Sequence, residues 1–311
     1  MIELIKYQES DKSIWDNFLD KSRIDSFLFN RDFMDYHADR FEDSSFLIYR
    51  KRKLQALMPG NIANKIFYSH QGLTYGGLIS SNKITIKDTL EIFTKLNALL
   101  KNKGVEEVIY KPTPHIYHLY PSEEDLYALF IHGAEKIACN ISSTIMQQNK
   151  ISFIESRKSG IRKALKEGVI VSESNELSEF WNILENNLKT HFGKTPVHSL
   201  AEIKKLKNYF PEQIKLYTTL IDNNIVGGTL LFVMKNIVHV QYISANETGK
   251  SMGALDLLFH ELINNYYVDY PIFDFGQSTE QNGNYLNEGL IFQKEGFGGR
   301  GAVYETYRYT L

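Results

Sequence analysis

The pattern of hydrophobic and polar positions repeats one arrangement of elements along the chain. Residues 53–112 predict two strands, a glycine-containing turn, a long helix and a further strand. Residues 225–279 predict the same order, with the turn at ETGKSMG and the helix at ALDLLFHELINNYY. The two segments share little sequence identity, so the match is one of pattern. Two copies of one α/β unit predict two similar lobes with a cleft between them, where small-molecule sites commonly form.

The rest of the chain fits a mixed-sheet α/β protein of two domains. A basic helix is predicted at 153–168 and ends at Gly168, and the alternation over 298–311 predicts a closing strand. A chain of 311 residues exceeds what one hydrophobic core usually supports. We therefore expect two domains, residues 1–149 and residues 150–311.

Charge and cysteine content exclude several classes of protein. The formal net charge of −2 argues against a protein that mainly coats nucleic acid, so no DNA partner is expected. The single cysteine, Cys139, excludes an internal disulfide and every multi-cysteine zinc pattern, and its strand context predicts a small core residue. The N-terminus has no apolar leader, and no run approaches the ~18 apolar residues of a membrane span. We therefore expect a cytoplasmic protein without a membrane span.

The segment SHQGLTYGG, residues 69–77, is the first candidate for binding. Its glycines lie between two strand signals and permit a ligand to approach the backbone closely. His70 and Tyr75 could then hydrogen-bond a polar substrate group. A tight turn with Tyr75 in the core explains the same residues, and the sequence leaves both interpretations open.

A second candidate is the turn that contains Gly249, Lys250, Ser251 and Gly253. It follows a predicted strand and opens a helix, where exposed backbone N–H groups and a lysine suit a phosphate or pyrophosphate. The turn matches neither the dinucleotide pattern GxGxxG nor the Walker loop. An ordinary glycine-containing turn before a helix is the alternative.

The predicted basic helix is a third candidate. Lys158, Arg162 and Lys166 are spaced by four residues and share one face, with Arg157 close by. Such a face could hold the diphosphate of a nucleotide-linked substrate. A solvated face balanced by neighbouring glutamates is the alternative, and without further context it is the preferred one.

A fourth candidate is the strand end DFGQST, which carries Asp274 and Gln277. Polar residues that end a strand lie at the sheet edge where α/β proteins bind ligands. His191 and His198 are seven residues apart and have no carboxylate at ligand spacing, so no metal site is expected. No sequence resembles a nucleophile elbow, so nucleophilic catalysis has no candidate.

Taken together, these segments resemble the Fem family of aminoacyltransferases and their GNAT-like acyltransferase relatives. The resemblance rests on SHQGLTYGG, SRKSGIRKALKEGVIV, TPVHSLAEI, and DFGQST followed by QKEGFGG, and on their order along nearly the whole chain. It implies two tandem GNAT domains and transfer of an acyl group from an activated carrier to an amine. No long helical arm is found in the second half, so FemX is a better match than FemA or FemB.

The resemblance also implies roles for particular residues. In GNAT enzymes the turn before the central helix binds the pyrophosphate of acyl-CoA through a pattern like [QR]-x-x-G-x-[GA]. Here Lys250 replaces the first residue and Leu255 the last. A basic residue at Arg157 or Arg162 would contact the diphosphate of a UDP-linked substrate. Lys294 matches the lysine of an FKxGFG-like segment, although Gln293 stands in place of the phenylalanine.

Further roles follow from the acyl-transfer chemistry that the resemblance implies. Asp274 would orient or deprotonate the amine, and Lys294 would stabilise the developing charge. His70, Tyr75 and His198, with Gln277, Arg157 and Arg162, are the substrate-binding candidates, and Gly249, Lys250, Ser251 and Gly253 are the candidates for the acyl-CoA phosphates. No permanently bound cofactor is expected.

The function expected from the sequence is N-acyl transfer from acyl-CoA to an amine, such as an amino sugar in cell-envelope polysaccharide synthesis. The moderate charge favours this donor over tRNA. The first alternative is a FemX-like aminoacyltransferase that uses aminoacyl-tRNA and a UDP-linked peptidoglycan precursor. The second is a non-catalytic protein that binds such a precursor.

Overall fold

The computed structural model describes residues 1–311, except the side chains of His37, His191 and Phe192. The chain forms two compact units. Unit 1 comprises 1–141, 279–285 and 302–311, and unit 2 comprises 142–278 and 286–301. The units therefore divide at residue 141 instead of 149, and the last strand belongs to unit 1 although it follows unit 2 in sequence.

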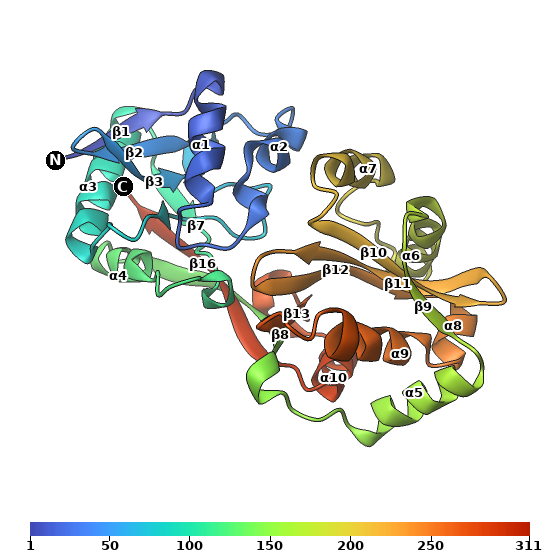
Figure 1. The fold of residues 1–311 in the computed structure, drawn as a ribbon. Coiled ribbons are helices and arrows are strands. Elements are labelled where there is room, and N and C mark those ends of the chain that lie inside the picture. The colour runs from blue at the N-terminus through green and yellow to red at the C-terminus, as the bar shows by residue number, and fades with distance from the viewer. The chain divides into compact units, whose positions relative to one another are not determined.

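Unit 1 contains helices α1–α4 and strands of two sheets (Figure 1). One sheet is antiparallel, with the order β1-β2-β3-β6, and the other has the order β4-β5-β7-β16-β8. The strands are β1 (Ile2–Lys6), β2 (Phe46–Arg50), β3 (Lys53–Met58), β4 (Asn61–Ala63), β5 (Ile66–Tyr68), β6 (Ile79–Ser80), β7 (Glu107–Tyr110), β8 (Glu135–Met146) and β16 (Arg300–Thr310). The helices are α1 (Lys12–Leu19), α2 (Arg31–Met34), α3 (Ile86–Asn102) and α4 (Glu124–Ile131).

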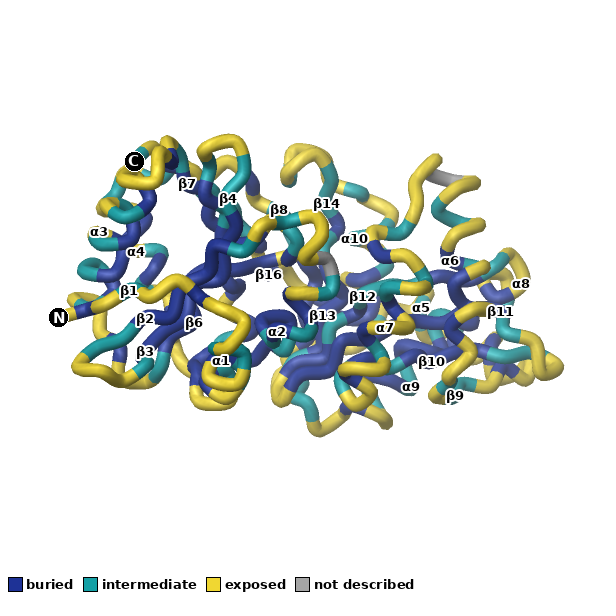
Figure 2. Tube along the Cα trace, turned by 90° about the horizontal axis from the view of Figure 1, so that it is seen from above, coloured by how far each residue is buried: buried dark blue, intermediate teal, exposed yellow. Residues whose placement is uncertain are grey.

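Helix α3 anchors the core of unit 1. Thr85 and Asp88 form a capping box at its N-terminus, which satisfies backbone N–H groups that the helix itself leaves unpaired. Its apolar stripe, Ile92, Phe93 and Leu96, is fully or almost fully buried against strands of both sheets. Figure 2 shows the resulting contrast between the buried strands β2 and β3 and the exposed turn that joins them.

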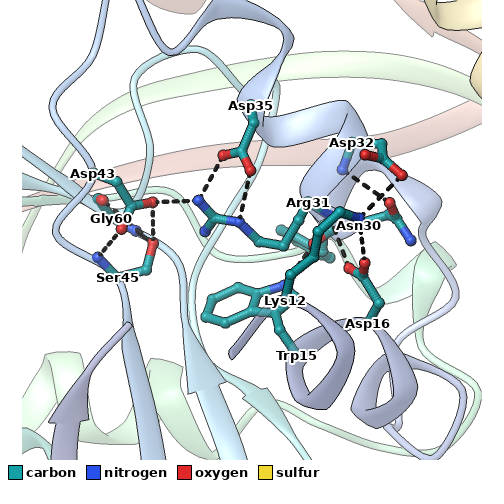
Figure 3. Close-up of polar contacts among 11 residues, drawn as sticks. Lys12, Trp15, Asp16, Asn30, Arg31, Asp32, Asp35, Asp43, Ser45 and Gly60 are labelled. Atoms are coloured by element: carbon teal, nitrogen blue, oxygen red, sulfur yellow. Dashed lines mark hydrogen bonds and ion pairs between the residues drawn. The ribbon is translucent and has the colours of Figure 1, made fainter. Parts of the chain in front are cut away.

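A buried arginine ties the N-terminal helices of unit 1 to its sheet (Figure 3). Arg31 is only 2% exposed and donates to Asp35 at 2.6 Å and to Asp43 at 2.9 Å. Its guanidinium also lies 3.8 Å from the centre of the Tyr7 ring. Asp43 in turn accepts from Ser45 at the start of the sheet. One side chain therefore connects α2, the loop before β2 and Tyr7, the residue that follows β1.

We expect Arg31→Met to destabilise unit 1 by about 2 kcal/mol, because it leaves the carboxylates of Asp35 and Asp43 without their cation. This is below the cost of breaking a fully buried pair, because these carboxylates are 42% and 29% exposed. Urea unfolding followed by Trp15 fluorescence, in a Trp181→Phe background, would measure it for unit 1 alone.

Lys12→Met is the matched control for Arg31. Lys12 pairs with Asp16 at 2.9 Å but is 39% exposed, so its loss should cost below about 1 kcal/mol. Equal effects of the two substitutions would contradict a special role of Arg31.

Unit 2 contains one mixed sheet with the order β8-β13-β12-β11-β10-β9. The pair β12–β13 is parallel and the pairs β9–β10, β10–β11, β11–β12 and β8–β13 are antiparallel. Its strands, besides β8, are β9 (Ile170–Ser174), β10 (Ile214–Ile221), β11 (Asn224–Val233), β12 (Ile237–Ala245) and β13 (Ile272–Gln277). The short strands β14 (Thr279–Glu280) and β15 (Tyr285–Leu286) form a separate ribbon.

Helices cover both faces of the unit 2 sheet, as Figure 1 shows. They are α5 (Glu155–Lys166), α6 (Leu177–Phe192), α7 (Leu200–Tyr209), α8 (Glu247–Ser251), α9 (Ala254–Glu261) and α10 (Glu288–Gly296). On one face, Leu258 and Phe259 of α9 pack with Phe273 and Phe275 of β13. On the other face, Trp181 of α6 packs edge-on against Tyr242 of β12.

The predicted mixed α/β fold is confirmed, with local corrections. The two strand signals on either side of the glycine-rich segment 69–77 form β5 and β6, which belong to different sheets. His70 at φ +75° and Gly77 at φ +87° interrupt the extended backbone between them. Cys139 is exposed and not in the core, because Ala138 takes the inward position in the alternation of β8. No helix of the described residues has both the length and the apolar character needed to cross a membrane.

Candidate active site

The candidate site lies where strands β12 and β13 part. The parallel register pairs Ile237 with Ile272 and ends with His239 opposite Asp274. Beyond this pair, β13 becomes irregular against β8 and Gly276 adopts φ +72°, a conformation that favours glycine. In a regular strand, backbone carbonyls accept hydrogen bonds from the neighbouring strand. At this irregular end of β13 they can accept from side chains instead.

Asp274 is completely buried in a polar pocket of its own. It is 0% exposed, and its Oδ1 accepts hydrogen bonds from Ser142 and, at 3.1 Å, from Thr144 of β8. Its Oδ2 lies 2.7 Å from Nδ1 of His239. The carboxylate accepts from these groups, so it holds the His239 ring in one orientation. Because Asp274 has no exposed surface, a bound molecule could be influenced by it only through a neighbour such as His239.

His239 is a candidate site residue that the sequence analysis missed. Its side chain is 13% exposed, and its ring edge lies beside Gly276, where a Cβ would be 3.3 Å from Cε1. A histidine oriented by a buried carboxylate is suited to accept and return a proton. The sequence gave no sign of this pair, since 35 residues separate its members and only the strand register brings them together.

Lys294 projects from α10 into the same region. It is 5% exposed, and its Nζ donates to the carbonyl oxygens of Gly276 at 2.8 Å and Gln277 at 2.7 Å. Burial lowers the pKa of Lys294 to about 8, and the nearby negative charge of Asp274 partly opposes this effect. The third N–H of the ammonium has no partner among the described residues, so it can donate to a developing oxyanion.

His198 and Gln277, two substrate-binding candidates, lie in the same unit. His198 is buried, and its Nδ1 is 2.7 Å from the hydroxyl of Tyr242 on β12. Tyr242 and His239 belong to the same strand, so His198 is connected to the site through β12. Gln277 ends β13 and is half-buried, and its carbonyl is the one that accepts from Lys294.

The glycine turn expected to hold phosphates is used for packing inside unit 2. The N–H of Gly249 donates to the side chain of Asn246, which caps α8. Lys250 pairs with Glu247 at 2.8 Å, and Ser251 donates to the Thr248 carbonyl at 2.9 Å. These contacts explain most of the turn residues by local structure.

Gly253 has a packing role at the start of α9. It adopts φ +73°, and a Cβ there would lie 2.5 Å from the carbonyl oxygen of Gly160 in α5. Arg157 of α5 donates to Asp256 in the first turn of α9 at 2.8 Å. Helix α5 therefore packs closely against the N-terminus of α9, with the Gly160 carbonyl beside Gly253.

The two arginines expected to contact a diphosphate have different environments. Arg157 is 20% exposed and is neutralised by Asp256, whereas Arg162 is 63% exposed and pairs with Glu155 on the helix surface. Only Arg162 lies in a position open to a ligand.

His70 and Tyr75 belong to unit 1. His70 is buried and packs edge-on against Phe41. Tyr75 is 2% exposed, hydrogen-bonds Ser26 at 2.9 Å and packs against Tyr117. Both side chains therefore have internal partners in the core of unit 1.

Metal coordination has no support in the described part of the chain. No three His, Cys, Asp or Glu side chains among the described residues are grouped as a metal site requires. The side chain of His191, considered with His198 above, lies outside the described residues.

Part of the chain matches a known domain family. Residues 153–285 match the family of the acetyltransferase (GNAT) domain. No curated protein shows significant sequence similarity to the chain.

Three solved structures share the fold over almost the whole chain. FemX superimposes with a TM-score of 0.73 and 11% identity, covering 99% of this chain and 97% of that chain. The C-terminal domain of a putative lysylphosphatidylglycerol synthetase from Agrobacterium fabrum superimposes with a TM-score of 0.63 and 11% identity. The match covers 97% of this chain and 92% of that chain. A tandem GNAT protein from the clavulanic acid biosynthesis pathway superimposes with a TM-score of 0.56 and 8% identity. The match covers 100% of this chain and 98% of that chain. Residues 153–285 therefore match an acetyltransferase (GNAT) domain, and the chain shares its fold with FemX and with a tandem GNAT protein over almost its whole length.

Proposed function

We propose that this protein transfers an aminoacyl group from aminoacyl-tRNA to an amine of a cell-envelope precursor. The observation that carries the choice of donor is the packing of α5 over the N-terminus of α9. The carbonyl oxygen of Gly160 and the Arg157–Asp256 pair occupy the surroundings of the helix start that would bind the pyrophosphate of acyl-CoA.

The space between β12 and β13 supports the same choice. A cavity between these strands, α9 and α10 has a volume of about 10 Å³, roughly the room for one water molecule. Its aromatic walls come from Phe259, Phe275 and Phe297. An extended acyl-CoA arm would need these rings to move, whereas an ester donor that approaches from elsewhere would not.

The chemistry follows from His239, Asp274 and Lys294. The neutral amine nitrogen attacks the ester carbonyl carbon, a C–N bond forms, and the carbonyl electrons move onto oxygen. His239 accepts the proton that the amine loses, while Asp274 stabilises the resulting imidazolium. The third N–H of Lys294 stabilises the oxyanion. When the intermediate collapses, the C–O bond to the tRNA ribose breaks and His239 returns the proton to the leaving hydroxyl.

The acceptor is proposed from the fold neighbours. FemX is the aminoacyltransferase that the sequence resembles, and a second neighbour is named for lysylphosphatidylglycerol synthesis. These relatives favour an acceptor that belongs to the cell envelope and a donor made in the cytoplasm, where we place the protein.

A second candidate is acyl transfer from acyl-CoA to an amino sugar. One observation favours it: the turn with Gly249 and Lys250 follows a central strand and opens a helix, and Lys250 remains 40% exposed. The moderate net charge of the chain also agrees with a donor smaller than tRNA.

Parallel assays with two labelled donors test the proposal. The full-length protein is incubated with UDP-linked peptide precursors or UDP-amino sugars, and with either a charged tRNA pool or acetyl-CoA. We expect mass spectrometry to detect an aminoacylated product with charged tRNA only. An acetylated product would establish the second candidate. No product with either donor, together with binding of a precursor, would indicate a non-catalytic binding protein.

A further inference from the structure

A pocket in unit 2 opens beside the C-terminal end of β8. It is bounded by the end of β8, the turn that follows, the residue before β13 and the start of β16, and has a volume of about 280 Å³. Sites for drug-sized ligands usually begin at about 300 Å³, so this one suits a molecule the size of a single amino acid. The lining of this β8 pocket includes Thr144, Met146, Gln148, Asn149, Ile151, Pro271 and Arg300.

The walls of the β8 pocket are fixed by contacts within unit 2. The backbone N–H of Gln147 donates to the Pro271 carbonyl at 2.9 Å, and its side-chain amide donates to the Ile263 carbonyl at 2.8 Å. Gly298 adopts φ +89°, and a Cβ there would lie 2.4 Å from the carbonyl oxygen of Ile151, so the close approach of the two segments requires glycine. A pocket with fixed walls loses little conformational entropy when a ligand binds.

Arg300 gives the β8 pocket one positive charge. Its Nη1 donates to a neutral group, the carbonyl oxygen of Gly299, at 2.6 Å, and it forms no ion pair with any described carboxylate. None of the described lining residues is acidic. The guanidinium therefore favours a ligand with one negative charge, and a planar carboxylate matches its fork of N–H donors.

The rest of the lining combines apolar side chains with two amides. Met146 is 54% exposed and Ile151 is 43% exposed, and both line the pocket beside Pro271. A hydrocarbon side chain of a ligand would cover this apolar surface. The side-chain amides of Gln148 and Asn149 form no hydrogen bond with any described residue, so their oxygens can accept from an N–H group of the ligand.

We propose that the β8 pocket binds an amino acid with an apolar side chain, either free or as the C-terminal residue of a peptide. Its α-carboxylate lies on Arg300, and its side chain lies on Met146 and Ile151. Its N–H group donates to an amide oxygen of Gln148 or Asn149. A fatty acid would have no donor for these amides, and a phosphate would have no apolar part and more charge than one guanidinium balances.

Thr144 connects the β8 pocket to the candidate active site. Its Oγ1 donates to Oδ1 of Asp274 at 3.1 Å, and Oδ2 of Asp274 lies 2.7 Å from Nδ1 of His239. The three residues form one row across β8, β13 and β12, which spans two strand spacings or about 10 Å. An amino acid in the β8 pocket would therefore be a neighbour of the candidate site.

Calorimetry with the full-length protein tests the β8 pocket without any assay of catalysis. The ligands are leucine, alanine, glycyl-leucine, leucinamide, which lacks the carboxylate, 4-methylpentanoate, which lacks the nitrogen, and inorganic phosphate. We expect leucine or glycyl-leucine to bind about tenfold or more tightly than leucinamide, because a charge-assisted hydrogen bond is lost. 4-Methylpentanoate should also bind more weakly than leucine.

Variants of the lining locate the binding. Arg300→Gln should weaken leucine binding about tenfold or more. Arg308→Gln is the matched control, since Arg308 is also an exposed arginine of β16 but does not line the pocket, and it should leave binding unchanged. Met146→Ser should lower the affinity for leucine more than the affinity for alanine. Should Arg300→Gln not fold, the series of ligands with the wild-type protein decides.

The two sources of the ligand separate in the same experiment. Tighter binding of glycyl-leucine than of leucine identifies the end of a peptide, and the reverse order identifies a free amino acid. The proposal is overturned if leucinamide binds as tightly as leucine, if folded Arg300→Gln and Arg308→Gln bind alike, if neither leucine nor glycyl-leucine binds, or if phosphate binds most tightly. These results concern binding alone, so this proposal and the proposed acyl transfer fail independently.

Discussion

Replacing Asp274 with asparagine is expected to lower kcat by about 10³-fold while changing KM little. Asparagine keeps the size of the side chain and can still accept from Ser142 and Thr144. Its amide cannot accept from Nδ1 of His239 as the carboxylate does, nor stabilise the imidazolium, and positioned acid–base groups contribute about 10²–10⁴ in rate. Steady-state kinetics with saturating donor would separate the effect on kcat from that on KM.

Two comparisons distinguish a positioning role of Asp274 from a merely structural one. Asp256→Asn removes another largely buried carboxylate of unit 2 and breaks its 2.8 Å pair with Arg157, so it should lower stability without a comparable loss of rate. His239→Gln should lower kcat about as far as Asp274→Asn, and the double variant no further, because the two residues act as one unit. Two results would contradict the joint action of Asp274 and His239. One is a double variant whose loss of kcat is the sum of the two single losses, and the other is an equal loss of kcat in Asp256→Asn.

Of the candidate site residues, the sequence analysis identified Asp274 from its position at a strand end. It did not identify His239, and the reason is physical. Asp274 stands at the polar end of an apolar strand, a position visible from the alternation alone. His239 lies within an apolar strand, and only the parallel register with β13 makes it a partner of Asp274. Register depends on the packing of the whole sheet, so local pattern could not supply it. Lys294 was found only through the resemblance of QKEGFGG to a family segment.

For the glycine turn, the sequence predicted the position but not the role. Its position after a strand and before a helix was predicted correctly, because strand β12 and helices α8 and α9 have the expected order. The role of the turn depends on α5, which brings Gly160 against Gly253, a residue 93 positions later in the sequence. A pattern within one turn carries no information about such a neighbour. The order of strands and helices was therefore easier to predict from the sequence than the contacts that an individual turn makes.

Lys294→Met is expected to lower kcat by about 10²–10³-fold, the usual effect of removing one oxyanion donor. In the proposed mechanism the charged form of Lys294 is the active one. Because burial lowers the pKa of Lys294 to about 8, the rate should fall as the pH rises above 8. Lys294→Met should remove this alkaline limb, and Lys294→Arg, which stays charged, should retain partial activity without the limb.

The same lysine makes an independent prediction for stability. The unfolded chain keeps Lys294 protonated up to its ordinary pKa of 10.5, while the folded protein releases the proton at about 8. Between these values the unfolded state binds more protons, so the free energy of unfolding should rise with pH by up to about 3 kcal/mol relative to Lys294→Met. Lys207 provides the control, since it also donates to a carbonyl, that of Ile214 at 2.9 Å, and burial also lowers its pKa. Lys207→Met should alter stability but not the pH–rate profile. An alkaline limb that survives in Lys294→Met would assign the titration to another group and remove Lys294 from the mechanism.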